Sequence, residues 1–190
     1  MTRFDTSMKE MAMILESERL IFRQWKSKDL KPFFDLNSDL EVMEFFPSPL
    51  TRNESDEMAH KCMSLIEHQG YGFFAAELKS TQEFIGFIGL HSPDYLPFSP
   101  CIEIGWRLDK NFWRQGYATE GALAVLNYGF ETLKCREIVS FTSCINLASI
   151  AVMKRIGMQY VVDGDFDHPN LERGHALCRH VLYRISNPKS

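Results

Sequence analysis

The middle of the chain carries a strand, a helix and a second strand in direct succession. Residues 101–108 form an apolar run of strand length, and apolar side chains recur at helical spacing over residues 116–133. β-Branched and aromatic side chains in residues 137–142 predict the second strand. A helix that joins two strands of one sheet makes a parallel crossover. Residues 73–78 and 84–90 instead predict an antiparallel hairpin, so the sequence predicts an α+β fold with a mixed sheet.

Capping signals and periodicity predict the other elements. Thr51 and Glu54 have the spacing of a capping box, and the apolar residues behind them predict a helix that stops at Gly70. Asn146 opens a further helix, and Gly157 ends it. The remaining expectations are strands over residues 19–25, 160–162 and 180–185, a helix after Ser27, and loops over residues 91–100 and 163–179.

The length of 190 residues predicts one domain. We expect this domain over residues 17–186, after an N-terminal extension of residues 1–16. Charged residues interrupt the extension, which therefore lacks the apolar core of a secretory signal. The apolar side chains between Met8 and Leu15 are compatible with a short docking helix or with a frayed terminus.

The charge balance is slightly acidic. Lys and Arg number 21 against 25 Asp and Glu, which gives a formal net charge of −4. This argues against a bulk electrostatic grip on nucleic acid and against an anionic membrane surface. No apolar run approaches the roughly 18 residues of a membrane span. We therefore expect no nucleic-acid or membrane partner.

Five cysteines are scattered along the chain without a Cys-x-x-Cys pair. This pattern predicts free thiols in a reducing cytosol, and neither a disulfide framework nor a structural zinc site. We therefore expect a cytoplasmic protein. The cysteines are Cys62, Cys101, Cys135, Cys144 and Cys178.

A glycine turn separates the strand at 103–108 from the long helix that follows. The backbone amides of residues 115–119 would converge at the positive end of that helix, which is typical of a pyrophosphate-binding turn. Gly116 would let the backbone approach a phosphate closely. The alternative is a plain helix start with a packing glycine. Three nearby cations could add positive charge: Arg107, Lys110 and Arg114.

Two motifs together resemble one known family. The first is Trp113-Arg-Gln-Gly116-Tyr-Ala118, and the second is Asn146-Leu-Ala-Ser149. They resemble the pyrophosphate turn and the pantetheine-side helix of the GNAT superfamily of N-acetyltransferases. The likeness is greatest to the branch that contains the ribosomal-protein alanine N-acetyltransferases. It extends over residues 15–185, and Trp113 stands where the family usually has Gln or Arg.

The resemblance implies a fold, a cosubstrate and a set of binding residues. The fold would be a mixed, twisted sheet with splayed central strands, flanked by helices. Acetyl-coenzyme A would enter between the strands at 103–108 and 137–142, and its pantetheine would pair with the first strand's backbone. An amine would enter from the opposite side, and no metal would be needed. The binding residues implied are Ile104, Gly105, Trp106, Arg107, Leu108, Arg114, Gln115, Gly116, Tyr117, Ala118, Thr119, Asn146 and Ser149.

Direct acetyl transfer in a ternary complex is the mechanism we expect, with Glu103 and Ser149 as the catalytic candidates. Glu103 lies on the splayed strand, where a carboxylate could accept the amine's proton. The alternative for Glu103 is a structural ion pair with an arginine, such as Arg107. The family's usual acid is a tyrosine, and by counting from Asn146 its place is held by Met153. Ser149, Tyr117 or water could then protonate the departing thiolate, or no acid would be needed because backbone donors could stabilise the thiolate.

Other polar residues have simpler interpretations. Glu120 in the first turn of its helix suits the helix dipole without any catalytic duty. His168, His175 and His180 could supply a base or a metal ligand, but we favour roles in shaping the late loop. Cys144 is interpreted as a packing residue. The candidates for an acceptor pocket are Phe45, Phe46 and Phe98.

Several functional alternatives remain open at this level. The acceptor could be a protein N-terminal α-amine or a small-molecule amine. The domain could also bind acyl-coenzyme A without turnover, as a sensor or an assembly module. A homodimer formed through exposed strand edges is a further expectation.

Overall fold

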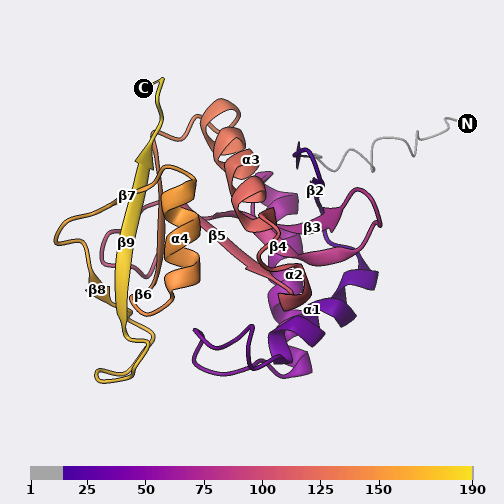
Figure 1. The fold of residues 1–190 in the computed structure, drawn as a ribbon, viewed down its shortest axis with the longest axis horizontal. Coiled ribbons are helices and arrows are strands. Elements are labelled where there is room, and N and C mark those ends of the chain that lie inside the picture. The colour runs from indigo at the N-terminus through magenta and orange to yellow at the C-terminus, as the bar shows by residue number, and fades with distance from the viewer. Residues whose placement is uncertain (1–14, 190) are drawn as a thin grey trace, which may run out of the picture.

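A single mixed sheet organises the molecule (Figure 1). The computed structural model describes residues 15–189. The strand order is β1-β2-β3-β4-β5-β6-β9-β7, and β8 pairs with β9. The strands are β1 (Leu15–Glu16), β2 (Leu20–Arg23), β3 (Phe73–Leu78), β4 (Phe84–His91), β5 (Glu103–Leu108), β6 (Glu137–Ser143), β7 (Gln159–Tyr160), β8 (Phe166–Asp167) and β9 (Arg179–Ser186).

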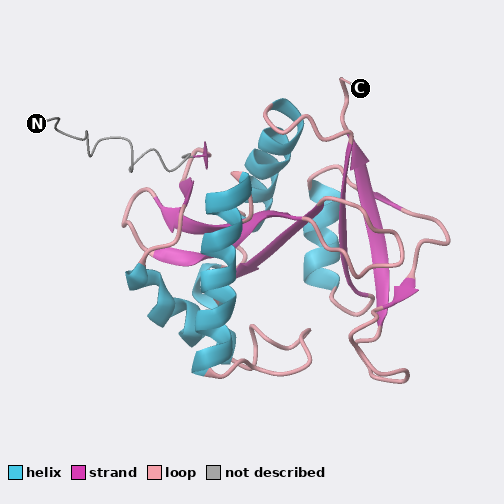
Figure 2. Cartoon of the chain, turned by 180° about the vertical axis from the view of Figure 1, so that it is seen from behind, coloured by secondary structure: helices cyan, strands magenta, loops and turns pink. Residues whose placement is uncertain are grey.

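Helices cover both faces of this sheet (Figure 2). One face packs against α3 and α4 around Ile88, Ile104 and Met153. The other face packs against α1 and α2 around Trp25 and Phe33. The helices are α1 (Leu30–Ser38), α2 (Arg52–Gln69), α3 (Tyr117–Glu131) and α4 (Leu147–Arg155), with short 3-10 turns at Ser27–Asp29 and Lys110–Phe112. No helix within residues 15–189 is long and apolar enough to cross a membrane.

The sheet is weakly joined between β5 and β6. β5 pairs with β4 along its whole length, from Gly86–Leu108 to His91–Glu103. With β6 it shares a single register pair, Glu103–Val139, in the parallel sense. The two strands therefore separate after this pair, and the β6-facing edge of the rest of β5 has no strand partner among the described residues.

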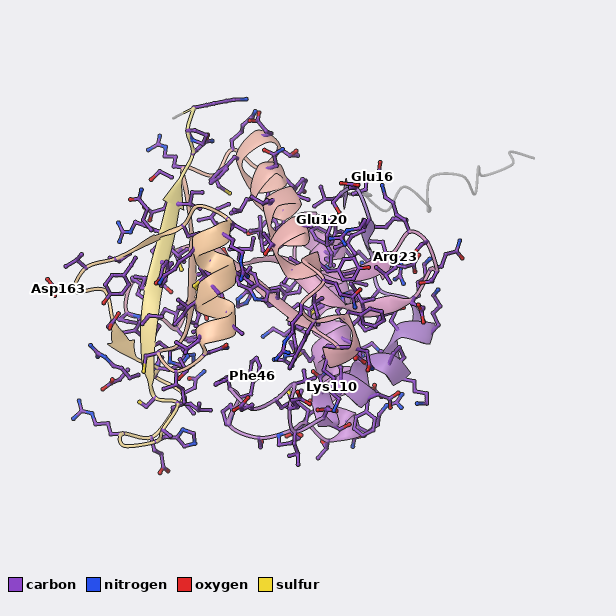
Figure 3. All side chains as sticks on the ribbon, in the orientation of Figure 1. Glu16, Arg23, Phe46, Lys110, Glu120 and Asp163 are labelled. Carbon is purple, nitrogen blue, oxygen red and sulfur yellow. The ribbon has the colours of Figure 1, made fainter. Side chains whose placement is uncertain are left out.

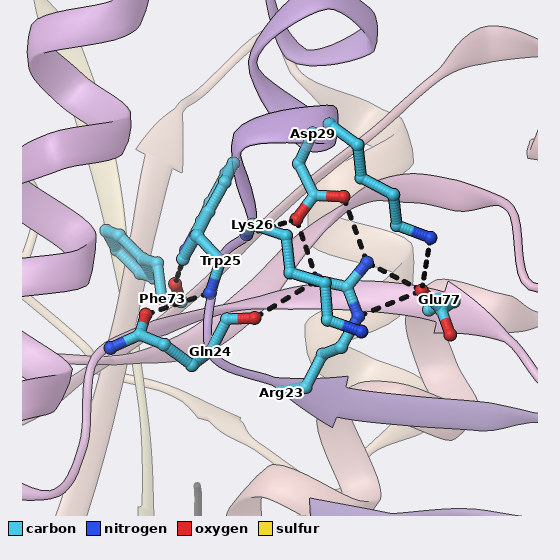
Figure 4. Close-up of polar contacts among 8 residues, drawn as sticks. Arg23, Gln24, Trp25, Lys26, Asp29, Phe73 and Glu77 are labelled. Carbon is cyan, nitrogen blue, oxygen red and sulfur yellow. Dashed lines mark hydrogen bonds and ion pairs between the residues drawn. The ribbon is translucent and has the colours of Figure 1, made fainter. Parts of the chain in front are cut away.

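A buried cluster of charges fixes α1 to the sheet (Figure 4). The Arg23 guanidinium on β2 donates to both carboxylate oxygens of Asp29, at 2.7 and 2.9 Å. It also donates to Oε2 of Glu77 on β3, at 2.6 and 2.9 Å. Asp29 in turn accepts from the Lys26 amide at 2.7 Å, so the turn that leads into α1 is anchored to two strands.

The main elements agree with the sequence predictions. The 73–78 and 84–90 hairpin, the parallel crossover through α3 and the mixed sheet are all confirmed. Thr51 and Glu54 form the predicted capping box, in which Glu54 Oε2 accepts from the Thr51 amide at 2.7 Å. Gly70 ends α2 with φ +78°.

The differences are short strands and their ends. The first predicted strand is shorter, because only Leu20–Arg23 keep their pairing with β3. The predicted strand at 160–162 is Gln159–Tyr160 instead. β1 and β8 were not predicted, and β1 brings Leu15 and Glu16 of the expected extension into the sheet. The rest of the proposed docking helix lies outside the described residues.

Candidate active site

A large cavity opens where β5 and β6 separate. Its volume is about 1560 Å³, and it extends from the start of α3 past β5 to the loop between α1 and α2. Every residue that the two motifs placed in the site lines it, except Gln115. Figure 3 shows Phe46, from the α1–α2 loop, between the half of the molecule that carries α4 and the half that carries α1 and α2. The cavity thus has one end at the glycine turn and another at the α1–α2 loop.

The glycine turn has the backbone geometry expected of an anion site. Gly116 is the N-cap of α3 and takes φ +85°, which side chains disfavour. A Cβ placed there would meet only Arg19 Nη2, at 3.4 Å. Residues 117–119 form the half-buried first turn of a helix of 15 residues and line the cavity, where free amides and the helix dipole favour an anion.

The three predicted phosphate-binding cations lie in different places. Arg114 lines the cavity beside the turn and is exposed. Lys110 is held instead by Asp39, with Nζ 2.6 Å from Oδ2. Arg107 is buried, and its side chain contacts Asn37 on the α1 face of the sheet, opposite α3. Of the three side chains, only that of Arg114 therefore lies beside the glycine turn, where it could contact a phosphate.

Arg19 is a cation at the turn that the sequence did not reveal. Its guanidinium lies over the Tyr117 ring at 4.4 Å and pairs with Glu120, with Nε 2.6 Å from Oε2. Glu120 also accepts from the Ser17 hydroxyl at 2.7 Å. Glu120 is therefore a structural partner of the β1–β2 turn, which agrees with its non-catalytic interpretation.

The strand β5 presents backbone to the cavity. Ile104 is fully buried, and its carbonyl accepts from the Ser140 hydroxyl at 2.9 Å. The Leu108 carbonyl accepts from the Trp113 indole at 2.8 Å. Trp113 therefore closes the turn against β5 at the position where the family usually has Gln or Arg. Gly105 and Trp106 lie between these two bonds and line the cavity.

At the start of α4, Asn146 acts as the helix cap. Its Oδ1 accepts from the Ser149 amide at 3.1 Å, and its Nδ2 donates to Thr142 Oγ1 at 3.0 Å. Ser149 lines the cavity. Met153 is fully buried in the core and does not line the cavity, so the counted position of the family's tyrosine faces away from the site.

Glu103 lies at the cavity wall beside a histidine. His91 Nδ1 is 3.5 Å from Glu103 Oε2, and both residues line the cavity. Burial raises the pKa of the Glu103 carboxyl, while His91 partly opposes this effect. The structural alternative of an ion pair with Arg107 is not found, because Arg107 contacts Asn37 instead. A carboxylate with a raised pKa at the wall of a cavity is a candidate proton acceptor.

The sequence did not reveal His91, because the loop at 91–100 does not fix the strand register. The sequence prediction begins the loop at this residue, whereas β4 continues through it and pairs it with Glu103. Only the apolar run that precedes His91 indicated a strand in this region.

The late histidines divide into two groups. His168 and His180 have ring centroids 4.9 Å apart and line the cavity with Phe141. Burial lowers the pKa of each. His175 is exposed, and its Nδ1 accepts from the Leu177 amide. Among residues 15–189, no group of three or more His, Cys, Asp or Glu side chains could hold a metal ion.

Of the aromatic acceptor-pocket candidates, Phe45 and Phe46 line the cavity. Phe98 packs instead against Phe141 and Phe166, with ring centroids 6.2 and 5.1 Å away, and lines a separate small pocket. Cys144 does not line the large cavity, which agrees with a packing role.

Comparisons with known proteins identify relatives of this fold and sequence. A family model described as the acetyltransferase (GNAT) domain matches residues 19–159. The uncharacterized N-acetyltransferase YnaD of Bacillus subtilis is 30% identical over 148 residues, which cover 77% of this chain and 83% of that protein. A GNAT-family acetyltransferase from Bacillus anthracis has a TM-score of 0.76 at 28% identity, over 92% of this chain and 99% of that one. The ribosomal L7/L12 α-N-protein acetyltransferase RimL, solved with coenzyme A, has a TM-score of 0.73 at 18% identity, over 91% and 97%, and shares the fold alone.

Proposed function

Because the chain belongs to the GNAT acetyltransferase family and is an N-acetyltransferase, we propose that it moves an acetyl group from acetyl-coenzyme A to a primary amine by direct attack within a ternary complex. The observation that carries this proposal is the separation of β5 from β6 after Glu103–Val139, beside the glycine turn. A thioester held in this opening is reachable from both ends of the cavity.

The cosubstrate binds along one route through the cavity. Its pyrophosphate sits on the amides of residues 115–119, with Arg114 and Arg19 nearby. Its pantetheine runs along the free edge of β5 and forms backbone hydrogen bonds at Ile104–Trp106, as an added strand would. Ser149, at the start of α4, lies beside the sulfur.

Glu103 deprotonates the acceptor ammonium, directly or through water. The neutral amine then attacks the thioester carbonyl carbon, and a C–N bond forms as the carbonyl oxygen takes the negative charge. Collapse of this intermediate breaks the C–S bond. The remaining excess proton on nitrogen passes to the thiolate through Ser149 or water, which leaves an amide and coenzyme A.

Coenzyme A binding to two variants at one position tests the site. Gly116→Asp and Gly116→Asn are nearly isosteric, and Asn and Asp both tolerate positive φ better than other side chains do. Only Asp adds negative charge to the proposed pyrophosphate site. We expect calorimetry to show that Asp weakens coenzyme A binding at least about tenfold more than Asn does, which corresponds to about 1.4 kcal/mol.

The stability of the folded state is the control in this experiment. Both variants have the same φ of +85° to accommodate, so their unfolding midpoints should fall by similar amounts. Equal coenzyme A affinities for the two variants would contradict the assignment of the turn. Binding without transfer to any amine would favour the acyl-coenzyme A sensor instead.

A further inference from the structure

Arg107 is a buried cation without a carboxylate partner among residues 15–189. The residue is 9% exposed, and burial lowers the pKa of its guanidinium to about 10, so it is charged at neutral pH. No salt bridge joins it to any acidic residue of the described chain. Its Nε is buried and has no hydrogen-bond partner there. Buried charges are ordinarily paired, because an unpaired one is costly.

The same chain shows how it satisfies a structural arginine. Arg23 is 5% exposed, and it donates to Asp29 and Glu77 as well as to the Gln24 carbonyl (Figure 4). Arg107 has nearly the same burial, but its hydrogen bond runs to a neutral amide oxygen, Asn37 Oδ1 at 2.6 Å. Residues 15–189 therefore provide no counter-ion for Arg107.

The surroundings of Arg107 hold the guanidinium in place. Asn37 is fully buried and donates to Ser55 Oγ at 2.9 Å, which fixes the amide that accepts from Arg107. The centre of the Phe46 ring lies 3.9 Å from the guanidinium carbon of Arg107, and the centre of the Phe87 ring lies 5.5 Å from it. The hydrogen bond to Asn37 and the two aromatic rings orient the guanidinium, but none of these groups carries a negative charge that would neutralise it.

Acidic residues do line the same cavity, but they are engaged or exposed. Glu41 lies 3.4 Å from Lys110 Nζ, and Glu44 is exposed on the α1–α2 loop. Glu103 pairs with His91. The Arg107 guanidinium is thus a buried positive group at the end of the cavity that lies by the α1–α2 loop.

Glu103 and Arg107 share one face of β5. Side chains four residues apart in a strand point the same way, and their Cα atoms are separated by about 13 Å. An acceptor whose amine lies at Glu103 can therefore place a second group at Arg107. The guanidinium donors left by Asn37 match the oxygens of a carboxylate.

We propose that the acceptor is an amine that also carries a carboxylate, and that Arg107 binds this carboxylate beside Phe46. The inference rests on the proposed function, since it places an acceptor amine at Glu103. Arg107 is then a specificity residue, which binds the far end of the substrate and takes no proton during transfer.

Binding of matched acceptors to the wild-type protein tests this proposal without any substitution. Each carboxylate is compared with its primary amide, in which a neutral group of nearly the same shape replaces the carboxylate. The pairs are 4-aminobutyrate with 4-aminobutanamide, 6-aminohexanoate with 6-aminohexanamide, and lysine with lysinamide. With coenzyme A bound, we expect calorimetry to show at least one carboxylate bound about tenfold or more tightly than its amide. Equal affinity within every pair, or no binding of any carboxylate, overturns the inference.

Two variants locate the preference. Arg107→Met should abolish the difference between carboxylate and amide, and Arg107→Lys should keep part of it. Lys110→Met is the matched control, because it removes a nearby cation that is already paired with Asp39. A preference that survives in Arg107→Met, or that disappears in Lys110→Met, overturns the assignment to Arg107. Melting curves identify any variant that does not fold, and the wild-type comparison then decides.

Transfer assays separate this inference from the proposed function. Acetylation of amides and carboxylates at equal rates would overturn the inference and leave the acetyltransferase assignment intact. Failure to bind coenzyme A at all would overturn the assignment of the cosubstrate site.

Discussion

At the scale of single residues, the proposed proton acceptor, Glu103, lies beside a histidine that affects its pKa. Glu103 is buried enough for its pKa to be raised, and His91 lies 3.5 Å from it. Since the proposed base must be in its carboxylate form to accept a proton, the rate should fall as the pH drops through this raised pKa. The acid limb of the pH–rate profile should therefore lie above the ordinary glutamate value of about 4.3.

Substitution of Glu103 separates catalysis from stability. Glu103→Gln should lower kcat by about a hundredfold or more and remove the acid limb of the pH–rate profile. Glu44→Gln, which removes an exposed carboxylate of the same cavity, is the control and should keep both. A wild-type rate for Glu103→Gln would exclude the base assignment.

The same substitution has a second expected effect, on stability. A raised pKa means that the folded state favours the protonated Glu103 carboxyl. The contribution of this group to the free energy of unfolding is therefore fully present below its unfolded pKa and is lost as the pH rises through its folded pKa. The glutamine side chain of the variant would mimic the protonated form at every pH. Urea unfolding should therefore show the Glu103→Gln variant gaining stability relative to wild type between mildly acidic and neutral pH. A parallel loss of stability at both pH values would contradict the raised pKa.

At the scale of elements, the Arg23 cluster connects β2, β3 and the turn before α1. Asp29 is fully buried, and its removal leaves part of the Arg23 guanidinium unpaired in the interior. Asp29→Ala should cost about 3–5 kcal/mol in the free energy of unfolding, measured in urea.

An exposed ion pair on α1 provides the comparison with the buried Arg23 cluster. Asp35 forms an exposed ion pair with Lys31, at 2.7 Å, and its side chain is 51% exposed. Asp35→Ala should cost no more than about 0.5 kcal/mol, because solvent screens the pair. Similar costs for Asp29→Ala and Asp35→Ala would show that burial does not set the strength of the Arg23 cluster.

Periodic elements, local caps and the parallel crossover could be predicted from the sequence, whereas pairing that no local pattern marks could not. The Thr51–Glu54 box and the helix after Gly116 depend on neighbours within four residues, so they are visible in the chain. β8 consists of two residues whose pairing depends on β9, and no local pattern marks it. The position of Arg107 against Asn37 joins residues 70 positions apart, so the sequence could not show that its side chain leaves the phosphate turn.

At the scale of the whole molecule, a ligand between β5 and β6 should join two parts of the sheet. A ligand that binds only the folded state stabilises it by about 2.7 kcal/mol at a concentration of about 100 times its Kd. Acetyl-coenzyme A should also slow amide hydrogen exchange in β5 and β6 more than in β3, which pairs with β4 from Phe73 to Glu77. Uniform slowing throughout the sheet, or slowing confined to α1 and α2, would contradict this placement.

The register pair Glu103–Val139 also sets how the sheet responds to mechanical load. Rows of backbone bonds share a shearing force between β3 and β4 and between β6 and β9, whereas few can share it between β5 and β6. Between the part that carries α1 and α2 and the part that carries β6 and β9, the sheet is therefore joined by few strand-to-strand hydrogen bonds, and the shared apolar core supplies the rest of the contact. Acetyl-coenzyme A bound there, as proposed, would bridge the two parts, so we expect the sheet to be stiffest with the cosubstrate bound and to soften when coenzyme A leaves.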